Sequence, residues 1–548
     1  MKTIKYIMVS MAMMLGLTSC NDWLEVYPEN VQPTDKYWAS KEDVEATLFS
    51  GYLYLRQSVT DYLIPWGEFR AGCVYNRRSS ASALQQFQIK PTTSEATWAP
   101  MYKIVNTANL VLKNASKAYD NDDTYTESEM KSHLCEAYWL RALAYFYIVR
   151  NWRDAPLITE PFETDDVSYN LPQSTEEEII AQIKTDLKTA IQMDAAKEVF
   201  NTTWETKGRA TKWAIYALMA DVCLWHHDFD ETISYANLIL NSTSSNRPTF
   251  MATPTRNSWF SIFYPGNSVE SIYEVQWSGE KSDGSATGTQ TNSLPYYFMA
   301  NQFGKTAGSL DDKHQFLYSQ TMKNMFNSEL SSIVDQDNAF NFESEESLDK
   351  AGRTLNGGYA VDPSIDVSGY MSTANAYVWK YIGGPTRSNP RTETNYDPNF
   401  IIYRVADIML MKAEALIMRN HGTSDQDNTE AMNLVNQIRK RTNLPELSIY
   451  SGMDFSELLE DVLHERIMEL AAEGKIWYDF VRMGRYTDPA GQVNFKEQFL
   501  IDNVTSFNDQ ATRNWITAVL SDEDAWFLPV PDAEMNTNSL LKQNHYYK

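Results

Sequence analysis

Apolar residues recur at three- and four-residue spacing over long parts of the chain, and this period predicts amphipathic helices. In the segment 98–117, Met101, Ile104 and Ala108 fall on one face of such a helix. The same period predicts further helices toward both ends of the chain. The expected helices span residues 40–54, 98–117, 126–152, 174–193, 209–226, 229–240, 402–419, 428–442, 454–474 and 476–483.

Polar residues mark where several of these helices begin. The side chain of the first residue can accept a hydrogen bond from the amide three positions later, and an acidic residue there can return the bond. The pattern therefore gives each helix a defined first residue. It predicts starts at Ser40 with Asp43, Thr126 with Glu129, Ser174 with Glu177, and Asp454 with Glu457.

The helices form pairs separated by an irregular middle. Segments 209–241 and 405–442 are helix–turn–helix units close to the length of a tetratricopeptide repeat, about 34 residues. The helical period is lost over 242–400, although residues 271–277 alternate as a short strand would. We therefore predict a mainly α protein, in which tetratricopeptide-like helical hairpins form a superhelical scaffold. An irregular, loop-rich subdomain containing short β-strands completes the fold.

The first residues predict export and lipidation. Lys2 and Lys5 precede an apolar stretch over 7–17, which is shorter than the about 20 residues that a membrane-spanning helix needs. Leu17-Thr-Ser-Cys20 is similar to a bacterial lipobox, which implies cleavage before Cys20 and acylation of that residue. Several acyl chains on one residue would anchor the protein stably. The alternative is a secreted protein with a chance cysteine at this position.

The other cysteines do not suggest a disulfide scaffold. Cys73, Cys135 and Cys223 cannot all pair with one another, and none lies at a spacing typical of zinc ligands. Cys135 and Cys223 fall on apolar helical faces, so we expect both to be small buried residues.

These features divide the chain into five parts. We expect a lipoprotein signal peptide at 1–19, a lipidated tether at 20–39, an N-terminal helical part at 40–241, a loop-rich and ligand-facing insertion at 242–400, and C-terminal helical hairpins with a tail at 401–548.

Charge excludes some partners. Asp and Glu number 72 against 47 Lys and Arg, a net charge of −25. Nucleic-acid-binding surfaces are basic, so no nucleic-acid partner is expected. Anchoring to anionic lipids by Lys and Arg is disfavoured for the same reason.

Motifs for catalysis and for metals are incomplete. His464-Glu465 begins like a metalloprotease helix, but Met468 stands where the second histidine is needed. Residues 120–123 look like the start of a calcium loop, yet the glycine and final glutamate of that loop are missing. We therefore expect a binding protein without catalytic residues, cofactor or metal. A glycoside hydrolase remains an alternative, because the distance between two carboxylates cannot be read from spacing.

Aromatic residues beside polar ones in the irregular segments suggest a sugar site. Sugar rings stack their C–H faces on Trp and Tyr, while their hydroxyls bond to polar side chains. For each ring the alternative is packing under a loop. Helical Trp98, Trp139, Trp213 and Trp477 are expected in the core. The candidate ligand-binding residues are Trp66, Arg70, Tyr75, Arg77, Arg78, Trp259, Trp277, Tyr296 and Tyr297. The pair Arg77-Arg78 could meet a carboxylated or sulfated sugar.

Several segments taken in order resemble the SusD/RagB family of outer-membrane lipoproteins. The lipobox is followed by Asn21-Asp-Trp-Leu24, and later segments are similar to the family's signature helices and tail. His545 departs from the small residue that is commoner in that tail. The later segments are 136–146, 208–218 with 220–221, 403–415, 464–470 with 473–474 and 477–479, 527–531 and 543–547.

The resemblance implies a function and partners. It implies capture of oligosaccharides at the cell surface and delivery to a SusC-like TonB-dependent transporter barrel, with attachment to the outer membrane through the lipid. Some relatives serve peptide uptake, so peptide capture by the same architecture is the alternative. A purely structural adaptor is disfavoured by the length of the irregular insertion. Ligand contacts differ between members of the family, so they are not carried over residue by residue.

Overall fold

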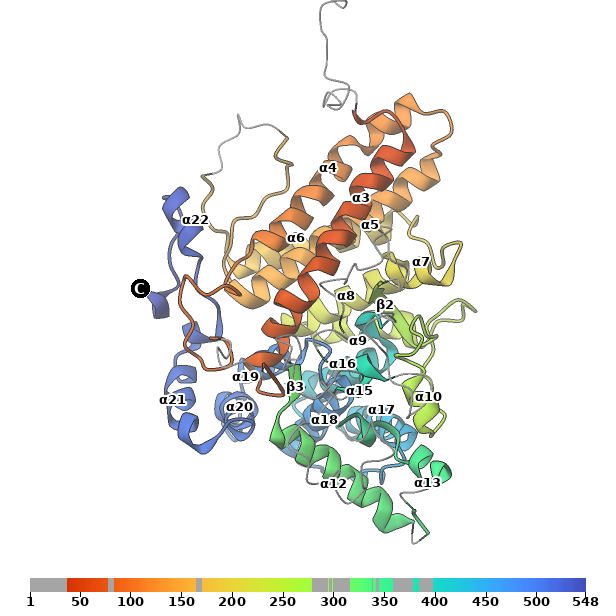
Figure 1. Cartoon of the computed structure of the whole chain (residues 1–548), viewed down its shortest axis with the longest axis vertical. Helices are drawn as coiled ribbons and strands as arrows, with labels where there is room; N and C mark the ends of the chain where they lie inside the picture. Colours follow the sequence, from red (N-terminus) through yellow and green to blue (C-terminus); the bar gives the residue numbers. More distant parts are fainter. Residues whose placement is uncertain are drawn as a thin grey trace, which may run out of the picture.

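The computed structural model (Figure 1) confirms a mainly α protein. Among the residues described, no helix combines the length and apolar character needed to cross a bilayer. The structure describes residues 37–76, 83–163, 170–277, 294, 298, 316–337, 339–341, 344–357, 378–383 and 398–548.

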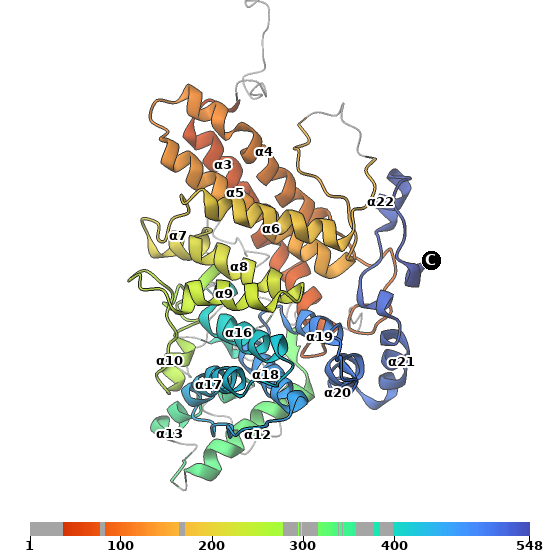
Figure 2. The same ribbon diagram turned by 180° about the vertical axis from the view of Figure 1, so that it is seen from behind.

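A continuous row of packed helices forms the scaffold, and Figure 2 shows it from the long N-terminal helices down to α17. Each helix packs on the next in the row. The predicted hairpin segments 209–241 and 405–442 lie far apart in sequence, yet they stack directly through α9 and α16. The row consists of α3 (Lys41–Ser58), α4 (Ala99–Asn121), α5 (Glu127–Trp152), α6 (Glu176–Gln192), α8 (Lys212–Trp225), α9 (Phe229–Leu240), α16 (Val405–Arg419) and α17 (Asp425–Arg441).

Helix starts follow the predicted capping pattern with one correction. Capping boxes are formed by Ser40 with Asp43 and by Thr126 with Glu129. The third box is made by Thr175 and Glu178, one residue later than predicted. Ser174 is not available as the cap because its backbone pairs with Ala155 in a β-bridge.

Two small antiparallel sheets lie beside the helices. The predicted strand is confirmed as β2 (Ser271–Val275), which pairs with β4 (Phe400–Arg404). Residues 402–404 were expected to begin a helix, and this is wrong. The β-branched and aromatic run at 400–403 forms a strand, and the helix begins only at Val405. The second sheet pairs β1 (Val74–Asn76) with β3 (Phe316–Tyr318).

A regular helix lies where the helical period was expected to be lost. In α12 (Gln320–Gln336), Met322, Phe326 and Leu330 are buried on one face, and the Ser319 side chain caps the first turn. Met322, Phe326 and Leu330 are at helical spacing in the sequence, but most residues between them are polar, so the period is weak. The remaining helices are α7 (Thr203–Gly208), α10 (Arg256–Phe260), α13 (Glu345–Lys350), α15 (Trp379–Ile382), α18 (Phe455–Leu470), α19 (Ile476–Gly484), α20 (Asp502–Ser506), α21 (Gln510–Leu520) and α22 (Asp532–Thr537), with short π- or 3-10-helical turns η2 (Val59–Leu63), η3 (Pro65–Phe69), η4 (Gly352–Gly357), η5 (Lys496–Ile501), η6 (Glu523–Trp526) and η7 (His545–Tyr547).

The core contains the aromatic residues that the helical pattern placed there. Trp98, Trp139, Trp213 and Trp477 are all buried, as predicted. Cys135 and Cys223 are buried and unpaired, which confirms that they act as small core residues, and Cys73 is buried and unpaired as well. Cys20 lies outside the residues that the structure describes.

Candidate ligand-binding surface

Two loop segments that contain four of the nine candidate residues adjoin the β1–β3 sheet in the sequence. Asn76 at the end of β1 pairs with Phe316 at the start of β3, because the strands are antiparallel. The chain that follows β1 therefore leaves from the same end of the sheet at which the 278–315 segment enters. Arg77 and Arg78 directly follow β1, and Tyr296 and Tyr297 belong to the entering segment. These four residues lie outside the described ranges, so their roles stay predictions.

Phe298 ties the second loop segment to the core. Its buried ring lies 5.4 Å from the ring of Phe316 on β3 and 4.9 Å from that of Tyr381 on α15 (centroid to centroid). The hydroxyl of Tyr381 donates a 2.8 Å hydrogen bond to the Ala472 carbonyl. The residue that follows Tyr297 is therefore anchored beside the β1–β3 sheet.

Trp66 and Arg70 were candidates, but both side chains are fully buried. The Trp66 indole donates to the Glu95 carbonyl at 2.7 Å, and its ring packs edge-on against Trp152. The Arg70 guanidinium lies 4.2 Å from the centre of the Trp477 ring and donates to the Trp526 carbonyl. Neither offers a face to a ligand in this conformation.

Trp259 and Trp277 are also placed in the core. The Trp259 ring lies 5.0 Å from that of Phe263, and the Trp277 amide donates to the Asn399 side chain at 3.1 Å. An apolar ring in an irregular segment can pack inward or stack on a ligand, and burial decides between the two. Trp66, Arg70, Trp259 and Trp277 are therefore core residues and present no face to a ligand.

Tyr75 is the described candidate that stays at the surface, since its side chain on β1 is half-buried. The backbone of β1 is held to the following segment, because the Asn76 amide donates to the Gln85 side chain at 3.2 Å. Residue 83 resumes the described chain after the segment that contains the two arginines. The described chain is thus held by a bond between Asn76, before that segment, and Gln85, after it.

Trp515 is a surface ring that the sequence analysis missed. It lies on α21 and is 48% exposed, and its indole nitrogen donates to the Gln86 carbonyl at 3.2 Å. This bond holds the Trp515 ring beside Gln86, whose neighbour Gln85 is bonded to Asn76 of β1. The signal was in the helical period, because Ile516, Val519 and Leu520 form the buried face and leave Trp515 outside it.

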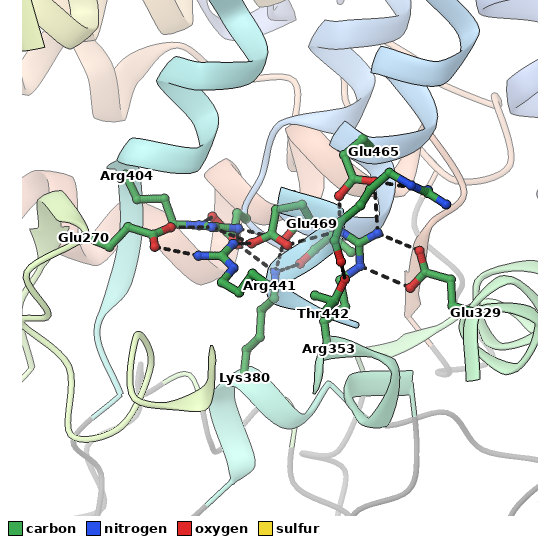
Figure 3. Close-up of polar contacts among 12 residues, drawn as sticks. Glu270, Glu329, Arg353, Lys380, Arg404, Arg441, Thr442, Glu465 and Glu469 are labelled. Carbon is green, nitrogen blue, oxygen red and sulfur yellow. Dashed lines mark hydrogen bonds and ion pairs between the residues drawn. The ribbon is translucent and has the colours of Figure 1, made fainter. Parts of the chain in front are cut away.

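A buried ion network holds the elements that flank these loops (Figure 3). Arg404, at the end of β4, donates to Glu469 of α18 at 2.6 Å and to Glu270 at 3.1 Å. Arg441, at the end of α17, donates to the same two carboxylates at 2.5 and 2.6 Å. All four side chains are fully buried. The network therefore joins the start of β2 to α17 and α18.

Arg353 and Lys380 extend the network into the loop-rich segment. Arg353 of η4 donates to Glu329 of α12 at 2.6 Å and also pairs with Glu465 (Figure 3). Lys380 of α15 donates to the Glu469 carbonyl at 2.8 Å. Segments on both sides of the loops are thus fixed to α18. Glu465, which had looked like part of an incomplete zinc motif, instead serves this network.

The cations of the network lower the pKa of Glu469. Burial alone would raise that pKa, but Arg441, Arg404 and Arg353 outweigh it and hold it well below its usual range. Glu469 is therefore an ionised carboxylate surrounded by cations. In the described part of the chain, no group of three His, Cys, Asp or Glu side chains is arranged to hold a metal ion.

The described part of the scaffold has at least two concave regions. One, of about 540 Å³, is bounded by α4 and the segment near α22, and its walls are mostly apolar. The amide of Asn106 there is bonded on both sides to the backbone of Phe162. The other, of about 720 Å³, lies between α9, α16 and α17 and has a more polar rim.

Comparison with known proteins gives matches over nearly the whole chain. A profile described as "SusD family" matches residues 241–547, and one described as "Starch-binding associating with outer membrane" matches residues 22–224. The chain is 26% identical to SusD-like protein P38 of Formosa agariphila, over 90% of this chain and 94% of that protein. It is 25% identical to a SusD-like protein of Bacteroides ovatus, over 93% and 86% respectively.

Solved structures share the fold. A laminarin-binding SusD-like protein superposes with a TM-score of 0.64 at 21% identity, covering 93% of this chain and 100% of that one. Surface glycan-binding protein A from Bacteroides uniformis gives a TM-score of 0.67 at 18% identity, with the same coverage. At such identities the likeness shows the common fold alone.

Proposed function

The chain belongs to the SusD family, and from this premise we propose that it is a cell-surface lipoprotein that binds glycans without cleaving them. It captures oligosaccharides and passes them to a SusC-like TonB-dependent transporter. Two structural neighbours support the ligand class, since one is named as laminarin-binding and the other as a surface glycan-binding protein. Acylation of Cys20 attaches the protein to the outer membrane.

The observation behind the proposed site is the antiparallel pairing of β1 with β3. It brings Asn76 and Phe316 together at one end of a small sheet. In the sequence, Arg77 and Arg78 follow Asn76, and Tyr296 and Tyr297 precede Phe316. Tyr75 lies on this sheet. Aromatic rings with polar neighbours suit a sugar, whose C–H face stacks while its hydroxyls form hydrogen bonds. These residues form the proposed ligand surface.

Trp515 extends the same surface. Its ring is held by the Gln86 carbonyl, and the neighbouring Gln85 is bonded to the end of β1. A ring whose position is already fixed loses little conformational freedom when a ligand stacks on it. With a net charge of −25 on the chain, neutral sugars are favoured over strongly anionic ones. The pair Arg77-Arg78 would allow local binding of a carboxylated sugar.

Affinity electrophoresis tests the proposal. The chain from Asn21 onward is run through gels that contain laminarin, starch, xylan, galactomannan or homogalacturonan. We expect retardation by at least one polymer, and we expect Tyr75→Ala and the double variant Tyr296→Ala/Tyr297→Ala to reduce it. Trp204→Ala serves as the control, since that ring is 58% exposed on α7, on the opposite side of the molecule from α21.

Two results would contradict the proposal. Unretarded migration in all five gels would favour peptide capture instead. New reducing ends after incubation with the retarding polymer would show that the protein is an enzyme. For a neutral polymer, retardation should change little between low and high salt, because stacking and hydrogen bonds are screened far less than exposed ion pairs.

A further inference from the structure

The 720 Å³ concave region with the polar rim, called the groove below, has an apolar floor. It lies between the end of α9, the segment that follows it, and the helices α16 and α17, and its volume is about 720 Å³. Leu240, Phe250 and Met409 are among the apolar residues that line it. The volume falls within the range of about 300–1,000 Å³ that is typical of small-molecule sites.

The wall formed by residues 247–251 is fixed in place. Arg247 donates to the Leu240 carbonyl at 2.8 Å, and the Thr249 amide donates to the Val269 carbonyl at 3.0 Å. The Met251 amide donates to the Glu270 carboxylate at 3.0 Å. This wall is therefore bonded to the buried ion network.

Phe250 is held by the same network. The guanidinium of Arg441 lies 4.3 Å from the centre of its ring, and Arg441 in turn pairs with Glu270 and Glu469. The Phe250 ring thus packs against Arg441 and also lines the groove. A rigid aromatic floor is what stacking of a sugar ring requires.

The rim that α17 contributes is a row of uncharged polar side chains. Gln426, Asn433 and Gln437 line the groove at positions that share one face of the helix. Within the described chain, the side-chain amides of these three residues make no hydrogen bond to other residues. Glu430 of this rim pairs with Lys412 of α16 at 2.5 Å. On the facing wall, Arg247 donates to the Leu240 carbonyl, so one cation lies at the groove. The apolar cavity beside α4 differs, because its Asn106 amide is already bonded to the backbone.

We propose that this groove is a second glycan-binding site, which takes a short segment of a neutral oligosaccharide. An amide side chain both donates and accepts hydrogen bonds, as a sugar hydroxyl does, and neither needs a compensating charge. The apolar floor would receive the C–H face of the ring. The ligand class rests on the proposed function of the chain.

The groove and the proposed ligand surface lie apart. The groove is lined by α17, and Trp515 of the ligand surface lies on α21. Figures 1 and 2 both show these two helices on opposite sides of the lower half of the molecule. A short oligosaccharide would occupy one site at a time. A long polymer could contact both, and its apparent affinity would then exceed that of either site.

Methyl NMR tests the groove separately from the loops. The chain from Asn21 onward is labelled with ¹³C at its methionine methyl groups, and the Met409 signal is assigned with Met409→Leu. Maltotriose, laminaritriose, cellotriose, xylotriose and mannotriose are each added to about 20 mM, since a single weak site binds in the millimolar range. We expect at least one trisaccharide to shift the Met409 signal.

Variants identify the cause of the shift. Asn433→Ala/Gln437→Ala should weaken the titration at least about tenfold, and this variant should fold because alanine favours a helix. Gln57→Ala, an exposed amide on α3, is the matched control and should leave the titration unchanged. The proposal is overturned if no trisaccharide shifts Met409, or if the double variant titrates like the parent chain.

The two proposals can fail separately. Polymer retardation that is lost with Tyr75→Ala, together with a silent Met409 signal, would refute only the groove. A Met409 shift without any effect of the Tyr75, Tyr296 or Tyr297 variants on retardation would refute the proposed ligand surface and leave the groove.

Discussion

The backbone amide of Gly474 donates a 2.8 Å hydrogen bond to the side chain of Glu68, which lies 406 positions earlier in the chain. The amide of Lys475 donates to the same oxygen at 3.2 Å. Glu68 belongs to the π-helical turn η3, and Gly474 to the turn between α18 and α19. The N-terminal part of the scaffold is thus joined to the C-terminal helices through a fully buried carboxyl group.

Glu68 should make stability depend on pH. Burial raises its pKa from the ordinary 4.5 to about 8, although backbone amides counteract this. The folded state therefore retains a proton that the unfolded chain has released, so this contribution is complete below pH 4.5 and is lost as pH rises through about 8. Between about pH 6 and 9, the parent chain should therefore lose roughly 3 kcal/mol of stability that Glu68→Gln keeps.

Urea unfolding at several pH values would measure this difference. Glu42→Gln, a change at an exposed position on α3, is the control and should follow the parent profile. Parallel curves for the parent chain and Glu68→Gln would show that the proton uptake assigned to Glu68 is wrong.

Gly67 cannot be replaced without moving the backbone. A Cβ atom there would overlap the carbonyl group of Gly474, because η3 packs directly against that turn. Gly67→Ala should lower the free energy of unfolding by about 3 kcal/mol, or prevent folding. Gly452→Ala is the comparison, since φ is +79° there and nothing lies within 4 Å. It should cost only about 1 kcal/mol.

Thermal unfolding of the two glycine variants would separate steric overlap from backbone strain. Equal losses would contradict the close approach of η3 to Gly474. Gly67→Ala unfolding at the parent temperature would contradict it more directly.

Removing Arg353 should destabilise the protein strongly. Arg353→Met would leave the buried carboxylates of Glu329 and Glu465 without this cation, and breaking a buried ion pair typically costs about 3–5 kcal/mol. Lys131→Ala removes the exposed pair with Glu127 and should cost less than about 1 kcal/mol. Urea midpoints of the two variants would test this, and similar midpoints would refute a structural role for the network.

Trp515 should contribute to binding through its exposed ring. Trp515→Ala should weaken glycan binding about tenfold, equivalent to about 1.4 kcal/mol, without lowering the unfolding temperature greatly. Trp515→Phe should retain part of the affinity, because it keeps a ring but loses the bond to Gln86. Titration of the oligosaccharide that corresponds to the retarding polymer would measure both, with Trp204→Ala as the control. Unchanged affinity in Trp515→Ala would remove it from the ligand surface.

The helical scaffold could be predicted because its signals are local. Apolar period and capping residues gave α4, α5 and α9 within a few residues. The errors have physical causes as well. Pairing with Ala155 moves the cap from Ser174 to Thr175. The local apolar period predicts a helix at Ile402, but strand pairing with β2 decides its conformation. Pairing with a distant segment is not visible in a local pattern.

The candidate site was predicted less well for a related reason. Trp66 and Trp277 stand among aromatic and polar residues, as a stacking ring would, but both are buried. Trp66 packs against Trp152, and the Trp277 backbone is bonded to Asn399; both partners are distant in the sequence. The pairing of β1 with β3, which joins the loop segments, connects residues more than two hundred positions apart. Trp515 could have been found, since its position follows from the helical period of α21.

The buried ion network also bears on how the chain reaches its fold. Glu270 and Arg441 are separated by 171 positions, and Arg353 and Glu465 by 112. Apolar surfaces can meet loosely and improve their contact later, whereas a carboxylate stripped of water needs its cation at once. We therefore expect α18 to stay hydrated until η4, β4 and α17 arrive together. That step loses the entropy of closing long loops before the ion pairs form, so it should be slow and should come late in folding. The elements between β2 and β4 that carry Arg353 and Lys380 would then join the scaffold last, and a partly assembled form without them should accumulate before this step.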